Sequence, residues 1–400
     1  MSRQKVIPVA CAYRKTGRNQ CKENGEKFMR ILYLCTYYHR AMVFRDSMNY
    51  LEKLGHEVTA FNAVAKGTTV DKKYQVIMDE KVVHQECFRF ADRYLYFLKQ
   101  KKIEKKLCSK MNISSFDVMH SHTLFNGGWV ALQLNKKYGI PYVVSVRNTD
   151  LNAFLKYKIF KDIARKIVKN ASAVMFLSEP YKNKFLNKCY SEEEQEQINK
   201  KCYVIPNGLE PFWLQNISAA RNGIHTPLEL LCVGKIDQNK NMEATVAVLN
   251  RLIEKGVNAH LTVIGQVIDE GVLDSLKAEA HVTVIPYLKK EQLIEHYKAS
   301  DIFIMPSFKE TFGRVYAEAM SQGMPVIYTR GQGFDETFSD GYIGYAVNPR
   351  SIEEITESVI KIIEQYPILS KRCVESCLVF NWEKIAEELQ TMYLRATKQQ

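Results

Sequence analysis

The chain has 400 residues, a hydrophobic content of 46% and a formal net charge of +12. This length and composition are ample for two hydrophobic cores of ordinary size. No apolar run reaches the roughly 18 residues that would span a bilayer, and no charged-then-apolar leader precedes a cleavage site, so secretion is not expected. The ten cysteines form neither a CxxC pair nor a metal-ligand pattern. We therefore expect reduced thiols, no bound metal and a cytoplasmic location.

The positive charge is concentrated in the first half of the chain. Residues 1–200 carry 36 Lys and Arg against 19 Asp and Glu, whereas residues 201–400 carry 20 against 25. A half-chain this basic predicts an anionic partner, either nucleic acid or a membrane surface. No zinc-finger spacing, RNP-like segment or basic zipper is present, so a membrane partner is favoured over nucleic acid. The expected location includes peripheral contact with the inner face of the plasma membrane.

Taken in order, the chain begins with a polar, basic stretch at 1–28 that predicts a poorly ordered extension. Apolar runs at 31–36, 58–61 and 116–120 then predict strands that alternate with helices, a rhythm typical of a parallel sheet. Residues 91–110 predict a helix that is first aromatic and then rich in lysine.

Candidate ligand-facing residues follow the strand that ends near residue 120. His122 comes directly after this strand and is equally suited to a ligand or to a packed, hydrogen-bonded position. Arg147 has a forked, permanently charged side chain that suits a phosphate or a carboxylate. Asp150 suits either the lining of a site or the N-cap of a helix expected at 151–169. That helix has an apolar side and many lysines, which predicts either a core helix with a solvated face or part of a membrane-facing patch.

The second half repeats the strand–helix rhythm after a turn, V-I-P-N-G-L, at 204–209. Proline and Asn-Gly at this turn are typical of a linker. A strand at 228–233 leads to Gly234, which lets the backbone approach a ligand. Lys235 and Lys240 then bracket a helix start, which favours anions. Further strands are predicted at 260–265 and 282–285, the latter followed by Pro-Tyr-Leu.

The stretch from 300 to 327 predicts strand, loop, helix and strand in succession. Glu310 lies in the loop at the carboxyl end of the first strand, where open α/β sheets bind ligands. Glu318 lies about one turn into the helix, so both carboxylates can face one crevice. The N–H groups of Thr311, Phe312 and Gly313 are placed to meet an anion at the helix start. The alternative is that Glu310 complements the helix dipole and Glu318 is solvated.

These motifs together resemble the retaining family 4 glycosyltransferases of the GT-B fold, enzymes of the kind used in bacterial surface polysaccharide synthesis. The similarity is carried by A-S-D-I-F-I-M-P-S, E-T-F-G, A-E-A-M and G-M-P-V-I around the two glutamates, by the V-I-P-N-G turn, and by D-V-M-H-S-H before residue 123. It covers about residues 29–393. It implies two Rossmann-like lobes facing across a cleft, an acceptor lobe at 29–206, a nucleotide-sugar lobe at 207–380, and a helix at 381–400 that crosses back to the first lobe.

The resemblance also implies the chemistry. A hexosyl group would pass from a nucleotide-sugar to a glycan or lipid-linked acceptor with retention, in polysaccharide, lipopolysaccharide or capsule synthesis, without a cofactor or a metal. Glu310, Lys240 and Lys235 would be catalytic. Glu318 would hold the ribose. The implied donor-binding set is Gly234, Lys235, Lys240, Tyr287, Leu288, Glu310, Thr311, Phe312, Gly313 and Glu318, and the acceptor or sugar lining is His122, Arg147 and Asp150.

The chain departs from the family pattern in three places. The loop after the first strand lacks the family's glycine pair, Arg147 stands where a histidine is usual, and Lys235 replaces an arginine, which keeps the charge but loses the bidentate fork. No D-x-D sequence occurs in the 400 residues, so lysines are expected to replace a metal clamp. The alternatives are a nucleotide-sugar 2-epimerase of the same fold and a non-catalytic basic module that binds membranes.

Overall fold

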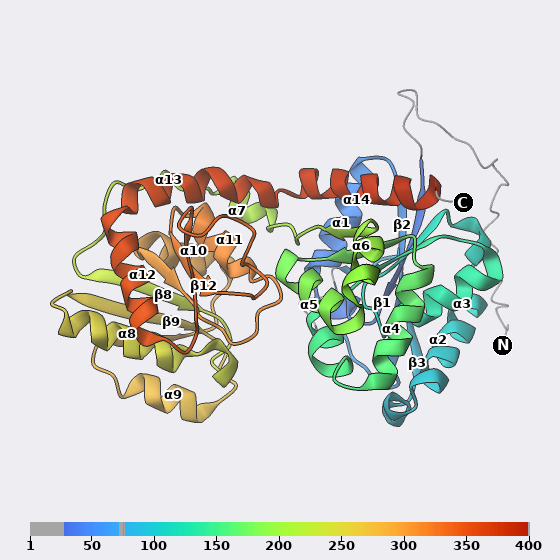
Figure 1. The fold of residues 1–400 in the computed structure, drawn as a ribbon, viewed down its shortest axis with the longest axis horizontal. Coiled ribbons are helices and arrows are strands. Elements are labelled where there is room, and N and C mark those ends of the chain that lie inside the picture. Colours follow the sequence, from blue (N-terminus) through green and yellow to red (C-terminus); the bar gives the residue numbers. More distant parts are fainter. Residues whose placement is uncertain (1–27, 72–74, 76, 399–400) are drawn as a thin grey trace, which may run out of the picture.

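The computed structural model describes residues 28–71, 75 and 77–398, and its two α/β lobes lie side by side (Figure 1). Each lobe is built on one sheet, and the described strands of both sheets pair in parallel. The α/β class with two Rossmann-like lobes is therefore confirmed. The basic extension expected at 1–28 lies, up to residue 27, outside the described residues.

The first sheet has seven strands in the order β3-β2-β1-β4-β5-β6-β7. Strands β4, β5 and β6 are buried along their whole length, because helices cover both faces of the sheet. The strands are β1 (Arg30–Cys35), β2 (Glu57–Ala65), β3 (Val82–Phe88), β4 (Val118–Ser121), β5 (Tyr142–Ser145), β6 (Ala173–Phe176) and β7 (Cys202–Val204). The helices are α1 (Met42–Lys53), α2 (Tyr96–Lys110), α3 (Gly128–Tyr138), α4 (Lys158–Asn170), α5 (Glu179–Cys189) and α6 (Glu192–Asn199).

The second sheet has six strands in the order β10-β9-β8-β11-β12-β13. Its strands are β8 (Leu228–Val233), β9 (Ala259–Gly265), β10 (Val282–Pro286), β11 (Ile302–Ile304), β12 (Val326–Thr329) and β13 (Gly344–Val347). Its helices are α7 (Pro211–Gln215), α8 (Met242–Glu254), α9 (Glu270–Lys277), α10 (Lys290–Ala299), α11 (Arg314–Ser321), α12 (Ile352–Glu364) and α13 (Tyr366–Ser376), and α14 (Trp382–Lys398) follows.

The strand order reverses once in each sheet, between β1 and β4 and between β8 and β11. Ligands of open α/β sheets bind in the crevice beyond the carboxyl ends of the strands at such switch points. A ligand site is therefore expected at the loops that follow β1, β4, β8 and β11.

Two crossings of the chain connect the lobes, the turn at 204–209 and helix α14. Figure 1 shows α14 running on from the second lobe across the first, where it packs against α1. A Cβ atom on Gly208 would lie 2.3 Å from the Trp382 ring, so only glycine lets the two crossings touch. At the far end of α14 the Tyr393 hydroxyl is hydrogen-bonded to His120 Nδ1 at 2.6 Å.

The structure differs from the expected helix at 151–169. The chain forms a five-residue π-helix, η5 (Asp150–Phe154), and α4 begins only at Lys158. The break arises because Asp150 accepts three backbone N–H bonds from neighbouring loops, which hold the first turn away from the path of α4. Strand β3 was not predicted, since its polar His-Gln-Glu centre interrupts the apolar run. In the part of the chain described, no helix has the length and apolar character needed to cross a bilayer.

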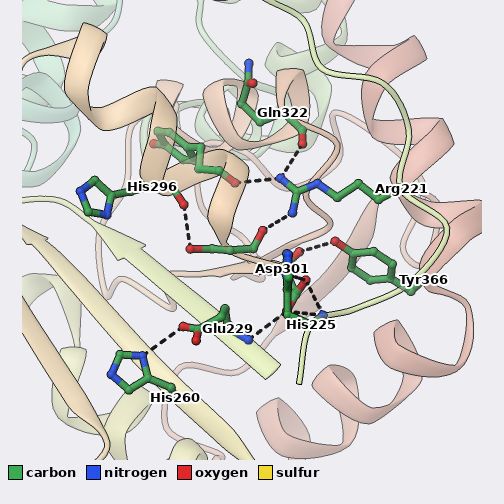
Figure 2. Close-up of polar contacts among 10 residues, drawn as sticks. Arg221, His225, Glu229, His260, His296, Asp301, Gln322 and Tyr366 are labelled. Carbon is green, nitrogen blue, oxygen red and sulfur yellow. Dashed lines mark hydrogen bonds and ion pairs between the residues drawn. The ribbon is translucent and has the colours of Figure 1, made fainter. Parts of the chain in front are cut away.

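A polar network holds two elements in place: β11, which leads into the loop with Glu310, and α11, which carries Glu318 (Figure 2). Arg221 donates to the carbonyl oxygens of Tyr297 at 2.8 Å and Gln322 at 3.0 Å, and also to that of Ser300. These carbonyls lie at the ends of α10 and α11. The guanidinium therefore ties together the back of α11 and the residues that lead into β11.

Asp301, directly before β11, is the buried centre of the same network. Its carboxylate accepts a hydrogen bond from the backbone N–H of Glu229 at 2.9 Å. It also accepts one from the backbone N–H of His225 and one from the His225 ring through Nδ1, at 2.7 Å. The Tyr366 hydroxyl donates to the Asp301 carbonyl at 3.1 Å. Because these bonds join β8, β11 and α13, the loops at the opposite ends of the two strands are held in a defined position.

Candidate active site

A cavity of about 440 Å³ lies between the lobes and is lined by both of them. From the first lobe come the loop after β5, at 147–149, and Leu177. From the second lobe come the loops after β8 and β11 and the first turns of α11, with Asn207 of the connecting turn between them. The cavity therefore lies where the carboxyl ends of the two sheets face each other.

An ion pair between Lys240 and Glu310 lies in this cavity. The Lys240 Nζ atom is 2.6 Å from Glu310 Oε2, and each side chain is 16% exposed. Lys240 ends the short helix η6 (Gln238–Lys240), whose N-cap Asp237 accepts the Lys240 N–H. The next residue, Asn241, has a φ of 57° and donates to the carbonyls of Pro306 and Pro349. These contacts fix the loop that carries the lysine against the loop that carries the glutamate.

The backbone at the start of α11 is shaped by Gly313. This residue has a φ of +76°, and a Cβ atom on it would lie 2.4 Å from the Tyr316 ring, so a larger residue is excluded. The Phe312 and Gly313 N–H groups have no acceptor among the described residues, in keeping with a place for an anion. The Thr311 N–H, expected to be free as well, instead donates to Glu310 Oε1 at 3.0 Å. The Thr311 N–H is therefore not free in the unliganded protein, but Thr311 lines the cavity and its contact with an anion stays a prediction.

Glu318 also lines the cavity, on the face of α11 that points inward. Its carboxylate accepts the Tyr297 hydroxyl at 3.3 Å. Burial raises the pKa of Glu318, while the charge of Arg314 and the Tyr297 hydroxyl oppose that rise. A buried carboxylate with unused acceptor capacity is suited to receive hydroxyl groups of a ligand.

Three predicted donor residues lie away from this cavity. Gly234 lines it, but Lys235 is exposed and is not among its lining residues. Tyr287 is 69% exposed and lines a separate cavity of about 400 Å³ beyond Gly265. Leu288 packs against the core of the second lobe. Lys235 and Leu288 are therefore not among the residues that line this cavity, and their contact with a donor stays a prediction.

In the first lobe only Arg147 of the predicted set lines the cavity. Its Nε donates to the His122 carbonyl at 3.3 Å, which ties the guanidinium to the loop after β4. His122 is 5% exposed, and its ring lies 4.1 Å from the His120 ring and 4.2 Å from the Tyr33 ring. Burial lowers the pKa of His122 well below its usual value. The expected ligand-facing role of His122 is corrected, because the side chain is packed among aromatic rings.

Asp150 is likewise buried beneath the cleft and does not line it. Its carboxylate accepts the N–H groups of Leu124 at 3.1 Å, Phe125 at 3.2 Å and Arg147 at 2.9 Å. Burial raises the pKa of Asp150 to about 6, and the three backbone donors oppose that rise. Asp150 therefore affects the site only by holding the loop at 147–149 in place. The prediction that its side chain lines the site is wrong.

The cavity also contains polar residues that sequence reasoning missed. Asn148 and Thr149 follow Arg147, Asn207 lies in the connecting turn, and Arg314 is the first residue of α11. Arg314 could have been found, because it follows the glycine that opens the helix. Among the described residues, no group of three or more His, Cys, Asp or Glu side chains is arranged to hold a metal ion.

Comparisons with known proteins agree with this geometry. The family model "Glycosyltransferase Family 4" matches residues 41–211, and "Glycosyl transferases group 1" matches residues 215–376, one for each lobe. The chain belongs to these glycosyltransferases. It is similar to the alpha-monoglucosyldiacylglycerol synthase of Acholeplasma laidlawii, with 24% identity over 86% of this chain and 90% of that one.

Two solved structures are similar in fold to this glycosyltransferase. Anabaena HepE in complex with UDP and glucose has a TM-score of 0.65 and 15% identity, covering 90% of this chain and 98% of HepE. The apo lipopolysaccharide outer core galactosyltransferase WaaB has a TM-score of 0.71 and 15% identity, covering 92% and 99%. The predicted family and GT-B fold are confirmed. The alternatives of an epimerase and of a non-catalytic module are not favoured.

Proposed function

We propose that this glycosyltransferase moves a hexosyl group from a nucleotide-sugar, with retention and without a divalent ion, to a lipid-linked or glycan acceptor. The observation that carries the proposal is the Lys240–Glu310 pair in the cavity between the lobes. A lysine beside free backbone N–H groups suits a diphosphate, and a neighbouring carboxylate suits sugar hydroxyls. The UDP and glucose complex of HepE supports a nucleotide-sugar donor of this class.

The chemical difficulty of the reaction is the negative charge that develops on the departing diphosphate. Lys240 and the N–H groups of Phe312 and Gly313 stabilise that charge, and such preorganised donors contribute most in the transition state. Arg147, from the first lobe, and Arg314, the first residue of α11, add two further cations to the same cavity. Glu310 accepts a hydroxyl of the donor sugar, and Glu318 accepts the ribose hydroxyls. Because cations supply the charge stabilisation, the reaction does not require a metal clamp.

A panel of UDP-, GDP- and ADP-hexoses tests the donor proposal. We expect slow hydrolysis of one nucleotide class without acceptor, release of the matching nucleoside diphosphate, and a transferred sugar with the donor's anomeric configuration by proton NMR. A 2-epimerase would instead return an epimerised sugar. If no nucleotide-sugar is hydrolysed or bound, the donor proposal fails, and an inverted product refutes retention alone.

The acceptor lobe also carries features that support contact with an anionic membrane. Helices α2 and α4, which carry many of the lysines, both contact α3 at Trp129: the Phe97 ring lies 5.0 Å from the Trp129 ring, and Lys166 Nζ lies 5.4 Å from it. Basic residues beside exposed aromatic and aliphatic side chains are typical of interfacial surfaces. The exposed apolar side chains near these lysines are Phe90, Tyr94, Leu95, Phe97, Leu98, Tyr157 and Ile159.

Vesicle binding tests this contact. We expect the protein to cosediment with phosphatidylglycerol vesicles at low ionic strength and to be released as added salt shortens the Debye length. Reversing the charge of Lys101 and Lys161 should abolish cosedimentation while donor hydrolysis persists. The matched control reverses Lys277 and Lys289 on the second lobe. Lys102 is left unchanged because it is paired with Asp92. A wild-type protein that ignores these vesicles would point to a soluble acceptor.

A further inference from the structure

A second cavity, of about 300 Å³, lies wholly within the first lobe. It is formed by residues that follow β1, the end of β2, and the start of α2. Among the residues that the structure describes, three cations, Arg40, Arg93 and Lys99, line it, and no Asp or Glu side chain does. Thr149 lines both this cavity and the cleft between the lobes, so the two are neighbours.

Lys99 is the most deeply placed of these cations. It is 9% exposed, its Nζ donates to Asn126 Oδ1 at 2.7 Å, and the Phe88 ring lies 4.8 Å away. An ammonium has three donors, and a neutral amide satisfies one of them. Burial, and next the charge of Arg93, lower the pKa of Lys99 to about 8. A buried cation without a counter-charge is costly, which is the condition that an incoming anion relieves.

The two arginines at the mouth are also uncompensated. Among the described residues neither Arg40 nor Arg93 forms an ion pair, and Arg93 packs over the Phe90 ring at 4.2 Å. The neighbouring carboxylate, Asp92, is already held by Lys102, whose Nζ lies 2.7 Å from both of its oxygens. The described lining of the cavity is therefore positively charged and includes no carboxylate that would compete with an anionic ligand.

A further polar group faces the cavity without a partner. His39 is 3% exposed, and its Nδ1 is 3.1 Å from Asn62 Nδ2, but its Nε2 has no hydrogen-bond partner in the described part of the chain. Burial lowers the pKa of His39, with Arg40 acting in the same direction, so the neutral ring is favoured. A neutral ring that accepts from the Asn62 amide through Nδ1 carries its proton on Nε2. That N–H is then available to an acceptor oxygen.

We propose that this cavity binds an anionic group, a phosphate or a carboxylate, carried by the acceptor. That the ligand is the acceptor rests on the proposed function. That the ligand carries an anionic group rests on the cavity alone. An acceptor anchored here by its anion reaches past Thr149 toward the Lys240–Glu310 cleft with its hydroxyl. The site therefore selects acceptors that carry the anionic group over neutral ones of the same shape.

Binding of glycerol 3-phosphate, measured by calorimetry with glycerol as the neutral comparison, tests the anion. We expect the phosphate ester alone to bind, and Arg40→Gln, Arg93→Gln and Lys99→Met each to weaken it about tenfold or more. The matched control, Lys136→Met at an exposed site on α3, should bind as the wild type does. Arg40 and Arg93 are exposed, so their variants should fold even if the Lys99 variant does not.

The lipid and soluble sources of the anion are separated by competition. If phosphatidylglycerol vesicles displace glycerol 3-phosphate and phosphatidylcholine vesicles do not, the anion belongs to a lipid head group. If the ester binds and neither vesicle displaces it, the acceptor is soluble. Nucleotide binding measured on the same variants should be unchanged, which separates this proposal from the donor proposal. The inference is overturned if the wild type does not bind the ester, or if the three variants at Arg40, Arg93 and Lys99 all bind it as the wild type does.

Discussion

The Lys240–Glu310 pair allows a double-mutant experiment in which the structure predicts whether each variant weakens or restores UDP binding. In the unliganded protein the two side chains neutralise each other at 2.6 Å, in a cavity where each is 16% exposed. We expect Lys240→Met to weaken UDP binding strongly, Glu310→Gln to leave it unchanged or improve it, and the double variant to recover part of the loss. The recovery is the informative quantity, because a simple loss of contact would not produce it.

The magnitudes follow from two separate effects. Removing a charge-assisted hydrogen bond to the diphosphate costs about 1.5–3 kcal/mol, which corresponds to roughly 10- to 150-fold in affinity. Lys240→Met also leaves Glu310 unpaired, and two like charges ~5 Å apart repel by about 3 kcal/mol at an effective dielectric constant of ~20. Each side chain is 16% exposed, so solvent screens the charges and that repulsion is an upper value. We therefore expect a total loss of about 100- to 1,000-fold, of which the double variant recovers about tenfold.

Isothermal titration calorimetry with UDP, GDP and ADP measures all four proteins directly. The nucleoside diphosphate that matches the active donor in the hydrolysis panel should show the full cycle, and thermal melting should confirm that each variant is folded. The reasoning is refuted if the double variant binds no better than Lys240→Met, because Glu310 then does not face the diphosphate. It is also refuted if every variant binds all three nucleotides as the wild type does.

Three further predictions concern metal dependence and stability. Transfer activity should persist in EDTA, because Lys240 supplies the charge that a metal would; loss in EDTA with recovery in Mg²⁺ or Mn²⁺ contradicts this. Asp301→Ala should lower the free energy of unfolding by about 2–4 kcal/mol, because the buried N–H groups it satisfies lose their acceptor; Asp301→Asn should cost less in the same urea titration, and equal costs would count against the network. Burial, and next the charge of Glu210, raise the pKa of Asp46 to about 6. Because this value lies above the unfolded value of about 4, ionisation of Asp46 lowers stability as the pH rises from about 4 through 6. Asp46→Asn should then stabilise the protein by about 1–2 kcal/mol at pH 7.5, after allowance for its exposure, and not at pH 4; equal urea midpoint shifts at both pH values would show that the carboxyl charge is not the cause.

The sequence by itself determined the fold and the local geometry of one wall of the cleft. Local signals specify each element here. The apolar run at 302–305 specifies the strand, Pro306 ends it, Gly313 opens the helix and Gly323 ends the helix. Each boundary depends on residues only a few positions away. Glu310 and Glu318 therefore reach one cavity because a short loop and one helix connect them. The same local rules predicted the alternation of strands and helices, since apolar periodicity is a property of neighbouring residues.

Only the tertiary structure decided which side chains from distant segments of the chain line the same cavity. Lys240 and Glu310 are 70 positions apart and pair because β8 and β11 are neighbours in the sheet. Asp150 and Arg147 lie three positions apart, yet one is buried as an acceptor for three backbone N–H groups from two loops and the other lines the cleft. Burial of this kind depends on everything packed around a residue, and pattern and spacing describe only its neighbours along the chain.

The cationic cavity of the first lobe depends most on tertiary structure. Arg40, Arg93 and Lys99 come from the loop after β1, from η3 (Phe90–Tyr94) and from α2. The sequence showed an excess of lysine at 99–110 but not that Lys102 would be paired with Asp92 while Lys99 pointed inward without a carboxylate. Helical phase, strand order and the place of the neighbouring loop together decide whether a charge is paired, solvated or available to a ligand. Those three are set only when the lobe is assembled.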